Sequence, residues 1–298
     1  MKRRNFIANT AISAIAVSAY GFISFNGEQY VGDCETTTDI LGPFYRPNSP
    51  ERNNLLISGD AGNPVELSGT VRHKDCVTPY PKAKVELWHC DGKGVYDNTS
   101  NEFRYRATTF TDDKGHYSFT TILPVPYDVG NGNFRPAHFH MMITAAGYQP
   151  LVTQLYFKGD KHIGDDRYAS SSKASRRILD IQTADNGMKK VTYDVGMSVI
   201  LKVEAPTIDK LTGFYTDVEN KDNTVQFFKS DNALWRKNEA FGDRFEYAGN
   251  NTFEEANNPE SIYWRLQFEL MASGGVKLTE NYIDDDLVKH ATVYLKER

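Results

Sequence analysis

Two histidines one residue apart, His138 and His140, are the residues whose type and spacing first indicate chemistry. They lie in an apolar run that continues through Met141, Met142 and Ile143, as expected for a β-strand. Because side chains alternate along a strand, both imidazoles point to the same face, about one ligand spacing apart. The pair is therefore either two metal ligands on one strand or two polar residues on the solvated face of a half-buried strand.

Five sequence blocks decide between these two interpretations. They are LGPFYRPNSPER (41–52), VELWHCDGKGVY (85–96), TDDKGHYSFTTI (111–122), RPAHFH (135–140) and LVTQLYFKGD (151–160). In this order the blocks resemble the intradiol ring-cleavage dioxygenases, enzymes that hold non-haem iron. The resemblance implies four metal ligands: Tyr96, Tyr127, His138 and His140. Composition alone could not have selected two of the 17 tyrosines.

The resemblance implies ferric iron as the cofactor, and the chemistry of the four side chains agrees. A phenol with an ordinary pKa near 10 is deprotonated on a hard trivalent cation, because the nearby charge stabilises the phenolate. Two phenolates and a hydroxide balance the charge of iron(III), and two neutral imidazoles complete the ligand set. Zinc and ferrous sites more often combine histidine with carboxylate or cysteine, so the two tyrosines favour iron(III).

The resemblance also implies roles in the cleavage of a small aromatic diol by O2 to a muconic acid. Tyr96 stays bound to the iron, whereas Tyr127 is displaced and accepts a substrate proton. Arg135 stabilises negative charge on the ring, an electrostatic role, and Gln154 lies near the face that reacts with oxygen. Four apolar residues are expected to line the substrate pocket: Ile40, Leu41, Pro43 and Val129. Because they are uncharged and Asp128 is adjacent, we expect catechol to be preferred to a ring carboxylate such as protocatechuate.

Short strands must position these residues, and the sequence predicts an all-β protein. Alternating runs separated by turn signals recur from Val65 to Leu201, which predicts an antiparallel β-sandwich within residues 28–205. The composition shifts at 204–206. Residues 206–298 contain about eight short β-like runs, which favour a small β-barrel or meander similar to lipocalin-like accessory modules. No long helix is expected, and residues 165–180 contain at most a short turn or helix.

Residues 1–27 are expected to be an export signal separate from the fold. Lys2, Arg3 and Arg4 precede apolar and small residues that continue to Phe25. The Arg-Arg-x-Phe-Ile arrangement is similar to a twin-arginine signal, which exports folded proteins with their cofactor; a Sec signal that carries two arginines is the alternative. The protein is therefore expected to be periplasmic or extracellular, with no membrane association beyond the signal.

The overall charge argues against one class of partner, whereas the cysteine pairing and the oligomeric state stay open. The 298-residue chain has a net charge of -5 and no basic cluster outside its first four residues, so a nucleic acid is not expected as a partner. Cys34, Cys76 and Cys90 allow one disulfide, but their spacing leaves the pairing open. The oligomeric state is also open, because the helical segment that dimerises the catechol branch of the family has no counterpart before residue 38.

Two alternatives to an iron enzyme remain at the level of sequence. The T-D-x-x-G-x-Y pattern at 111–117 also occurs in transthyretin-like β-sandwiches, which are non-catalytic binding modules without iron. Such a module has no need of the combined tyrosine and histidine set. A zinc or copper hydrolase built on His-x-His is weaker, because no acidic residue lies close by in the sequence to act as a base.

Overall fold

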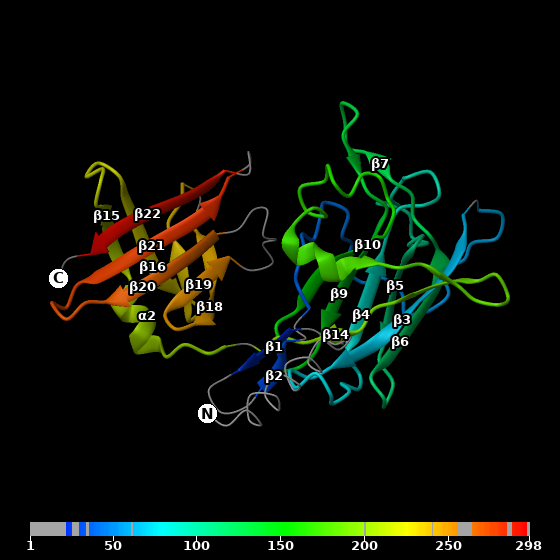
Figure 1. Ribbon diagram of the computed structural model, residues 1–298, viewed down its shortest axis with the longest axis horizontal. Helices are drawn as coiled ribbons and strands as arrows, with labels where there is room; N and C mark the ends of the chain where they lie inside the picture. Colours follow the sequence, from blue (N-terminus) through cyan, green and yellow to red (C-terminus); the bar gives the residue numbers. More distant parts are fainter. Residues whose placement is uncertain are drawn as a thin grey trace, which may run out of the picture. The chain divides into compact units, whose positions relative to one another are not determined.

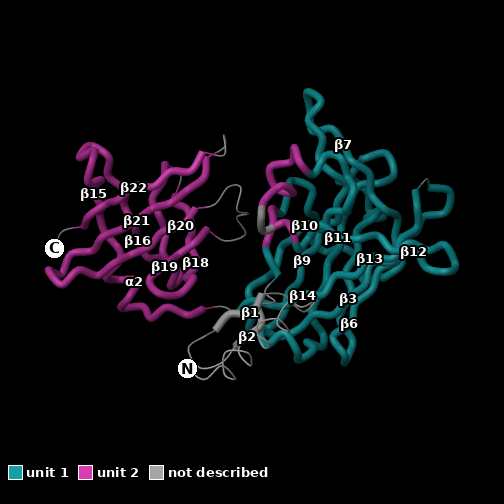
Figure 2. The backbone as a smooth tube through the Cα atoms, viewed as in Figure 1, with its two compact units in different colours: residues 1–37, 41–163, 176–199 teal, residues 38–40, 164–175, 200–298 magenta. Residues whose placement is uncertain are grey.

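The computed structural model describes residues 22–25, 30–33, 36–60, 62–199, 201–239, 241–255, 264–284 and 288–296. It divides into two compact units, shown in different colours in Figure 2. The sandwich unit comprises Met1–Thr37, Leu41–Ile163 and Arg176–Val199, and the barrel unit comprises Thr38–Ile40, Gly164–Ser175 and Ile200–Arg298. The expected domain boundary at residues 205 and 206 stays a prediction.

One sheet of the sandwich unit contains the histidine strand. Its order is β11-β10-β9-β4-β5, with antiparallel neighbours except for the parallel pair β10–β11. The bounds are β4 Lys84–Trp88, β5 Arg106–Phe110, β9 His138–Thr144, β10 Leu151–Phe157 and β11 Ile178–Leu179. Figure 1 shows β9 between β4 and β10. In the register, His140 lies opposite both Trp88 and Gln154, and His138 lies opposite Tyr156.

The second sheet has the order β12-β13-β3-β14, with β6 also paired to β3. The bounds are β3 Pro64–Arg72, β6 His116–Ile122, β12 Gln182–Thr183, β13 Lys189–Thr192 and β14 Val195–Gly196. Apolar side chains of both sheets form one buried cluster, to which this sheet contributes Leu67 and Phe119 and the first sheet contributes Leu87 and Phe139. The predicted β-sandwich is therefore confirmed, although β13 and β14 pair with β3 in parallel.

Shorter elements complete the sandwich unit. A two-stranded ladder pairs β7 (Tyr127–Asp128) with β8 (Phe134–Arg135), and another pairs β1 (Phe22–Phe25) with β2 (Tyr30–Asp33). Except for β1, the predicted export signal lies outside the described residues. Within the described residues, none of the helices is long and apolar enough to span a membrane. Cys76 is disulfide-bonded and Cys90 is a buried free thiol, whereas Cys34 lies outside the described residues.

The barrel unit contains the eight-stranded closed barrel that the short runs predicted. Its strands are β15 Gly213–Asp217, β16 Thr224–Ser230, β17 Ala233–Arg236, β18 Asp243–Gly249, β19 Thr252–Glu255, β20 Trp264–Leu270, β21 Val276–Ile283 and β22 Lys289–Lys296. The alternation of apolar and polar residues in these strands places the apolar ones inside, where they form a cluster of their own.

Two helices are present in the described residues, and the sequence indicated only one of them. The 3-10 helix η1 (Ser172–Arg177) falls in the stretch where a short helix was expected. The helix α2 (Ala205–Leu211) was not predicted. It begins with a proline in its first turn and buries only Ile208 and Leu211, which is too short a pattern for a helical period to be recognised.

Candidate metal centre

Strand β9 presents both histidines on one face. Phe139 and Met141, between and after them, belong to the apolar core, so the alternation of the strand directs His138 and His140 to the opposite face. Both histidines are buried, each 1% exposed. Their Nε2 atoms lie 3.1 Å apart. The structure therefore excludes a pair on a solvated strand face, which was the simpler of the two interpretations of the His-x-His pair.

The two tyrosines come from outside this strand and meet the histidines. The Oη atom of Tyr96 lies 3.2 Å from Nε2 of His140 and 3.4 Å from Nε2 of His138. Tyr127 begins β7, and its ring packs edge-on against Tyr96 with a centroid separation of 5.6 Å. The ring of Tyr127 lies 5.7 Å from that of His138. All four predicted ligands therefore lie in one cluster.

Two glycines allow this close approach. Gly94 has a φ of +81°, and a Cβ atom there would lie 2.8 Å from Cβ of Tyr127. Gly42 has a φ of +71°, and a Cβ there would meet Cε1 of His140 at 3.0 Å. Any other residue would be strained by its backbone conformation and would also crowd a ligand. The two glycines therefore bring the segment around Tyr96 and the segment around Leu41 against the cluster.

Burial keeps both imidazoles neutral. It lowers the pKa of His138 to about 3 and holds the pKa of His140 well below its usual value. The Nδ1 atom of His138 donates to the carbonyl oxygen of Pro136 at 2.6 Å, which leaves a lone pair on Nε2 directed at His140. Burial, and after it the neighbouring Tyr127, raise the pKa of Tyr96 far above its usual value, so the phenol is protonated without a cation.

The geometry and the donors of the cluster fit a hard metal cation. Ligand atoms about 2.1 Å from a metal are themselves about 3 Å apart, and the three atoms of His138, His140 and Tyr96 meet at 3.1–3.4 Å. Nδ1 of His140, on the other side of the ring from Nε2, has no hydrogen-bond partner in the described residues. In the same part of the chain, no group of three or more His, Cys, Asp or Glu residues could hold a metal. The phenols are therefore essential to this donor set.

Arg135 and Gln154, the other two predicted catalytic residues, lie beside the cluster. Nη2 of Arg135 donates to Oε1 of Gln154 at 2.7 Å. The hydroxyl of Tyr156 donates to the same oxygen at 3.1 Å and lies 3.4 Å from Nη2 of Arg135. Sequence reasoning missed Tyr156, although it lies two residues after Gln154 on one strand. The alternation rule that selected the histidines would have placed Tyr156 and Gln154 on one face.

The four residues predicted to line a substrate pocket do not all lie beside the cluster. Leu41 and Pro43 are exposed and flank Gly42, which puts them next to His140. Val129 is 60% exposed in the turn that follows Tyr127. Ile40 falls in the barrel unit. Their role in binding substrate stays a prediction.

Two aromatic rings that the sequence did not single out cover the ligands. Trp88, opposite His140 in the register, stacks on its imidazole with centroids 5.0 Å apart and an interplanar angle of 10°. Phe44 stacks on Tyr96 at 4.3 Å and 18°. Stacked rings exclude water and fix ring orientation, so both contacts hold the ligands in place.

Comparison with known proteins identifies the family. Residues 40–199 match the family model described as a dioxygenase. The chain is 32% identical over 195 residues to catechol 1,2-dioxygenase of Candida albicans, covering 57% of this chain and 63% of that protein. It is 31% identical over 182 residues to hydroxyquinol 1,2-dioxygenase of Nocardioides simplex, covering 55% and 60%. The matched region thus spans less than two thirds of each relative.

Solved structures show the same fold. The structure of catechol 1,2-dioxygenase from Acinetobacter radioresistens matches with a TM-score of 0.50 at 25% identity, over 57% of this chain and 66% of that chain. The structure of 3-chlorocatechol 1,2-dioxygenase from Rhodococcus opacus matches with a TM-score of 0.50 at 22% identity, over 64% and 78%. The chain belongs to the intradiol dioxygenase family.

Proposed function

We propose that this protein is an exported intradiol dioxygenase that binds ferric iron and cleaves catechol-type diols with O2 between the two hydroxylated carbons. The observation that carries the proposal is the convergence of two buried neutral imidazoles and the phenol of Tyr96 at the spacing of metal ligands, with the ring of Tyr127 packed against Tyr96 and His138. Its occurrence in a member of the intradiol dioxygenase family supports the reaction class.

The residues of the site have distinct tasks in such a reaction. Ferric iron held by Tyr96, Tyr127, His138 and His140 would supply Lewis acidity toward the two diol oxygens. Tyr127 is only half-buried, so it is the phenol that a substrate can reach, and as the base it accepts a substrate proton at Oη. The guanidinium of Arg135, oriented by Gln154, stabilises negative charge on the ring.

Catechol and its small uncharged derivatives are the substrates we propose. The relatives are named for catechol, chlorocatechol and hydroxyquinol, none of which carries a carboxylate. Leu41, Pro43 and Val129 offer no charge to pair with a ring carboxylate, and Asp128 lies next to Val129. A carboxylate placed against these side chains would lose part of its hydration without gaining a cation, so protocatechuate should be a poorer substrate than catechol.

The test is the colour and iron content of the purified protein. The wild type, expressed with ample iron, should be red-brown from phenolate-to-iron charge transfer, and catechol added without oxygen should shift the band. His138→Ala should lose iron and colour, whereas His73→Ala, a matched change beside Tyr148, should keep both. A colourless, iron-free wild type would overturn the proposal and favour the non-catalytic binding module. A higher kcat/KM for protocatechuate than for catechol would overturn the substrate assignment alone.

Export forms the remaining part of the proposal. It is supported by Arg3, Arg4 and the apolar stretch that follows them, which lie outside the described residues. Replacement of both arginines by lysine should retain the protein in the cytoplasm, which cell fractionation would detect. Unchanged export would show that the twin-arginine assignment is wrong.

A further inference from the structure

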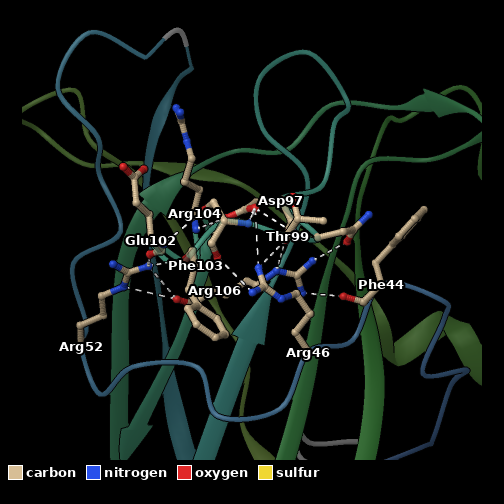
Figure 3. Close-up of polar contacts among 11 residues, drawn as sticks. Phe44, Arg46, Arg52, Asp97, Thr99, Glu102, Phe103, Arg104 and Arg106 are labelled. Atoms are coloured by element: carbon tan, nitrogen blue, oxygen red, sulfur yellow. Dashed lines mark hydrogen bonds and ion pairs between the residues drawn. The ribbon is translucent and has the colours of Figure 1, made fainter.

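The loop that carries Tyr96, between β4 and β5, adopts a backbone that needs support. Phe103 and Tyr105 have φ values of +51° and +53°, which non-glycine residues rarely adopt. Arg52 provides part of this support, because its side chain donates to the carbonyl oxygens of Glu102, Phe103 and Arg106. Figure 3 shows a group of arginines gathered around this loop.

Arg106 is the buried member of this group, with 1% of its surface exposed. Its Nε donates to the carbonyl oxygen of Asp97 at 2.7 Å, Nη1 to that of Phe44 at 2.5 Å, and Nη2 to Oδ1 of Asn98 at 3.0 Å (Figure 3). The guanidinium therefore joins two segments that are far apart in the sequence. One contains the residue after Tyr96, and the other contains Phe44.

The acceptors of Arg106 are neutral, so its task is to hold the backbone and not to pair a charge. Burial, and after it the nearby Arg46, lower its pKa to about 10, which leaves the guanidinium charged at neutral pH. The carboxylate of Asp97 is used elsewhere: it accepts the backbone N–H groups of Ser100 and Arg104 and lies 3.6 Å from Nη1 of Arg46.

Phe44 links this network to the metal ligands. Its ring stacks on Tyr96 and contacts Tyr127 edge-on, with centroids 6.4 Å apart. Arg106 thus anchors both sides of the stack, namely the backbone of Phe44 and the backbone next to Tyr96. A ring held in this way keeps water from one face of the phenol and fixes the direction of its Oη atom.

We propose that Arg106 is a positioning residue for the metal centre: it holds Phe44 against Tyr96 and thereby sets how tightly the phenol binds iron. The inference rests on the proposed function, since it concerns the same centre. Arg106 touches neither ligand directly and acts through Phe44 and the backbone at Asp97. Replacement by lysine keeps the charge but removes the fork that spans the two carbonyl oxygens.

Two variants and their combination test this inference. Arg106→Lys and Phe44→Leu should each weaken iron binding about tenfold, as expected for the loss of one charged hydrogen bond or one stacked ring. Both should shift the charge-transfer band in the same direction, and the double variant should resemble either single variant. Arg104→Lys is the matched control, because Arg104 pairs with Asp60 and not with Phe44. It should leave iron affinity and the band unchanged.

Hydrogen exchange of the metal-free protein separates this inference from the proposed function. In Arg106→Lys the backbone amides of residues 97–105 should exchange faster, whereas in Phe44→Leu they should not. If wild type bound no iron, the proposed function would fail, yet this exchange result would still test the loop-holding role. If Arg106→Lys did not fold, Asn98→Ala, which removes one acceptor, should show a smaller change of the same sign. Unchanged affinity and exchange, or full additivity of the two variants, would overturn the inference.

Discussion

Two buried polar clusters, one in each unit, differ in how their groups are paired. In the barrel unit, Glu280 is 1% exposed and accepts a hydrogen bond from Nε1 of Trp264 at 2.7 Å. Nε of Arg236 lies 3.4 Å from the same carboxylate, which balances its charge without a well-formed hydrogen bond. In the sandwich unit, the buried Nε2 atoms of His138 and His140 face each other at 3.1 Å.

We interpret the difference as one between a structural polar group and the proposed metal site. The carboxylate of Glu280 has a hydrogen-bond donor and a balancing cation within the barrel itself, although Nε of Arg236 has no hydrogen-bond partner in the described residues. The imidazoles and phenols of the sandwich unit concentrate lone pairs at one point, where the hydroxyl proton of Tyr96 can serve only one imidazole nitrogen at a time, so the arrangement favours a cation. Burial of a polar group therefore does not by itself indicate a site. Burial of several lone pairs with too few hydrogen-bond donors or cations does.

The largest effect expected from this comparison is on stability. Glu280→Ala should destabilise the barrel by about 3–5 kcal/mol, because the positive charge of Arg236 is left without its partner. His140→Leu in the metal-free protein keeps volume and removes a polar atom without a partner, so stability should change by less than about 1 kcal/mol. Urea unfolding followed by tryptophan fluorescence would measure both. Similar losses for both variants would show that the contrast between the units is wrong.

The second effect is a dependence of stability on pH, which we expect in the sandwich unit. His89 is fully buried, and burial lowers its pKa to about 4. The unfolded chain takes up a proton near pH 6.5 whereas the folded chain does not until about pH 4. Stability is therefore retained above pH 6.5 and lost as pH falls through this window, by about 3 kcal/mol in total. His89→Gln should lose less stability than wild type between pH 6.5 and pH 4 in urea titrations of the metal-free protein. Equal slopes would contradict the assignment.

The sequence predicted best those features that rest on local periodicity. Alternation of side chains placed His138 and His140 on one face, and the short runs after residue 206 predicted the barrel strands. Tyr96 and Tyr127 could be found only through resemblance, because they lie in different segments whose meeting depends on tertiary folding. The close approach at Gly42 and Gly94 likewise has no periodic signal.

The residues that sequence reasoning missed do not belong to the four proposed ligands but contact those ligands or the segments that carry them. Arg106 has no motif that marks it in the sequence, yet it joins Phe44 to the Tyr96 loop. Trp88 reads as an ordinary core residue, and its stack on His140 depends on strand order. Such contacts follow from which strands become neighbours, which a single sequence does not state.

The smallest expected effect concerns the hydrogen bonds beside the proposed metal centre and tests whether Arg135 and Gln154 depend on Tyr156. Tyr156→Phe removes one hydroxyl, which donates to Oε1 of Gln154 and lies 3.4 Å from Nη2 of Arg135. Because Arg135 remains bonded to Gln154, the pair should loosen and not separate. We expect kcat for catechol to fall about three- to tenfold, with KM, iron content and colour nearly unchanged, as expected for one neutral hydrogen bond.

Tyr148→Phe is the matched control, because it removes a hydroxyl bonded to Nδ1 of His73, away from the metal centre, and should leave kcat unchanged. An equal fall in kcat for Tyr148→Phe would mean that loss of any buried hydroxyl slows the enzyme. Wild-type kcat in Tyr156→Phe would mean that Arg135 and Gln154 need no third partner. In that case Arg135 and Gln154 would form a complete polar pair, as Glu280 does with its partners in the barrel. The contrast between the two clusters would then be confined to the four proposed ligands.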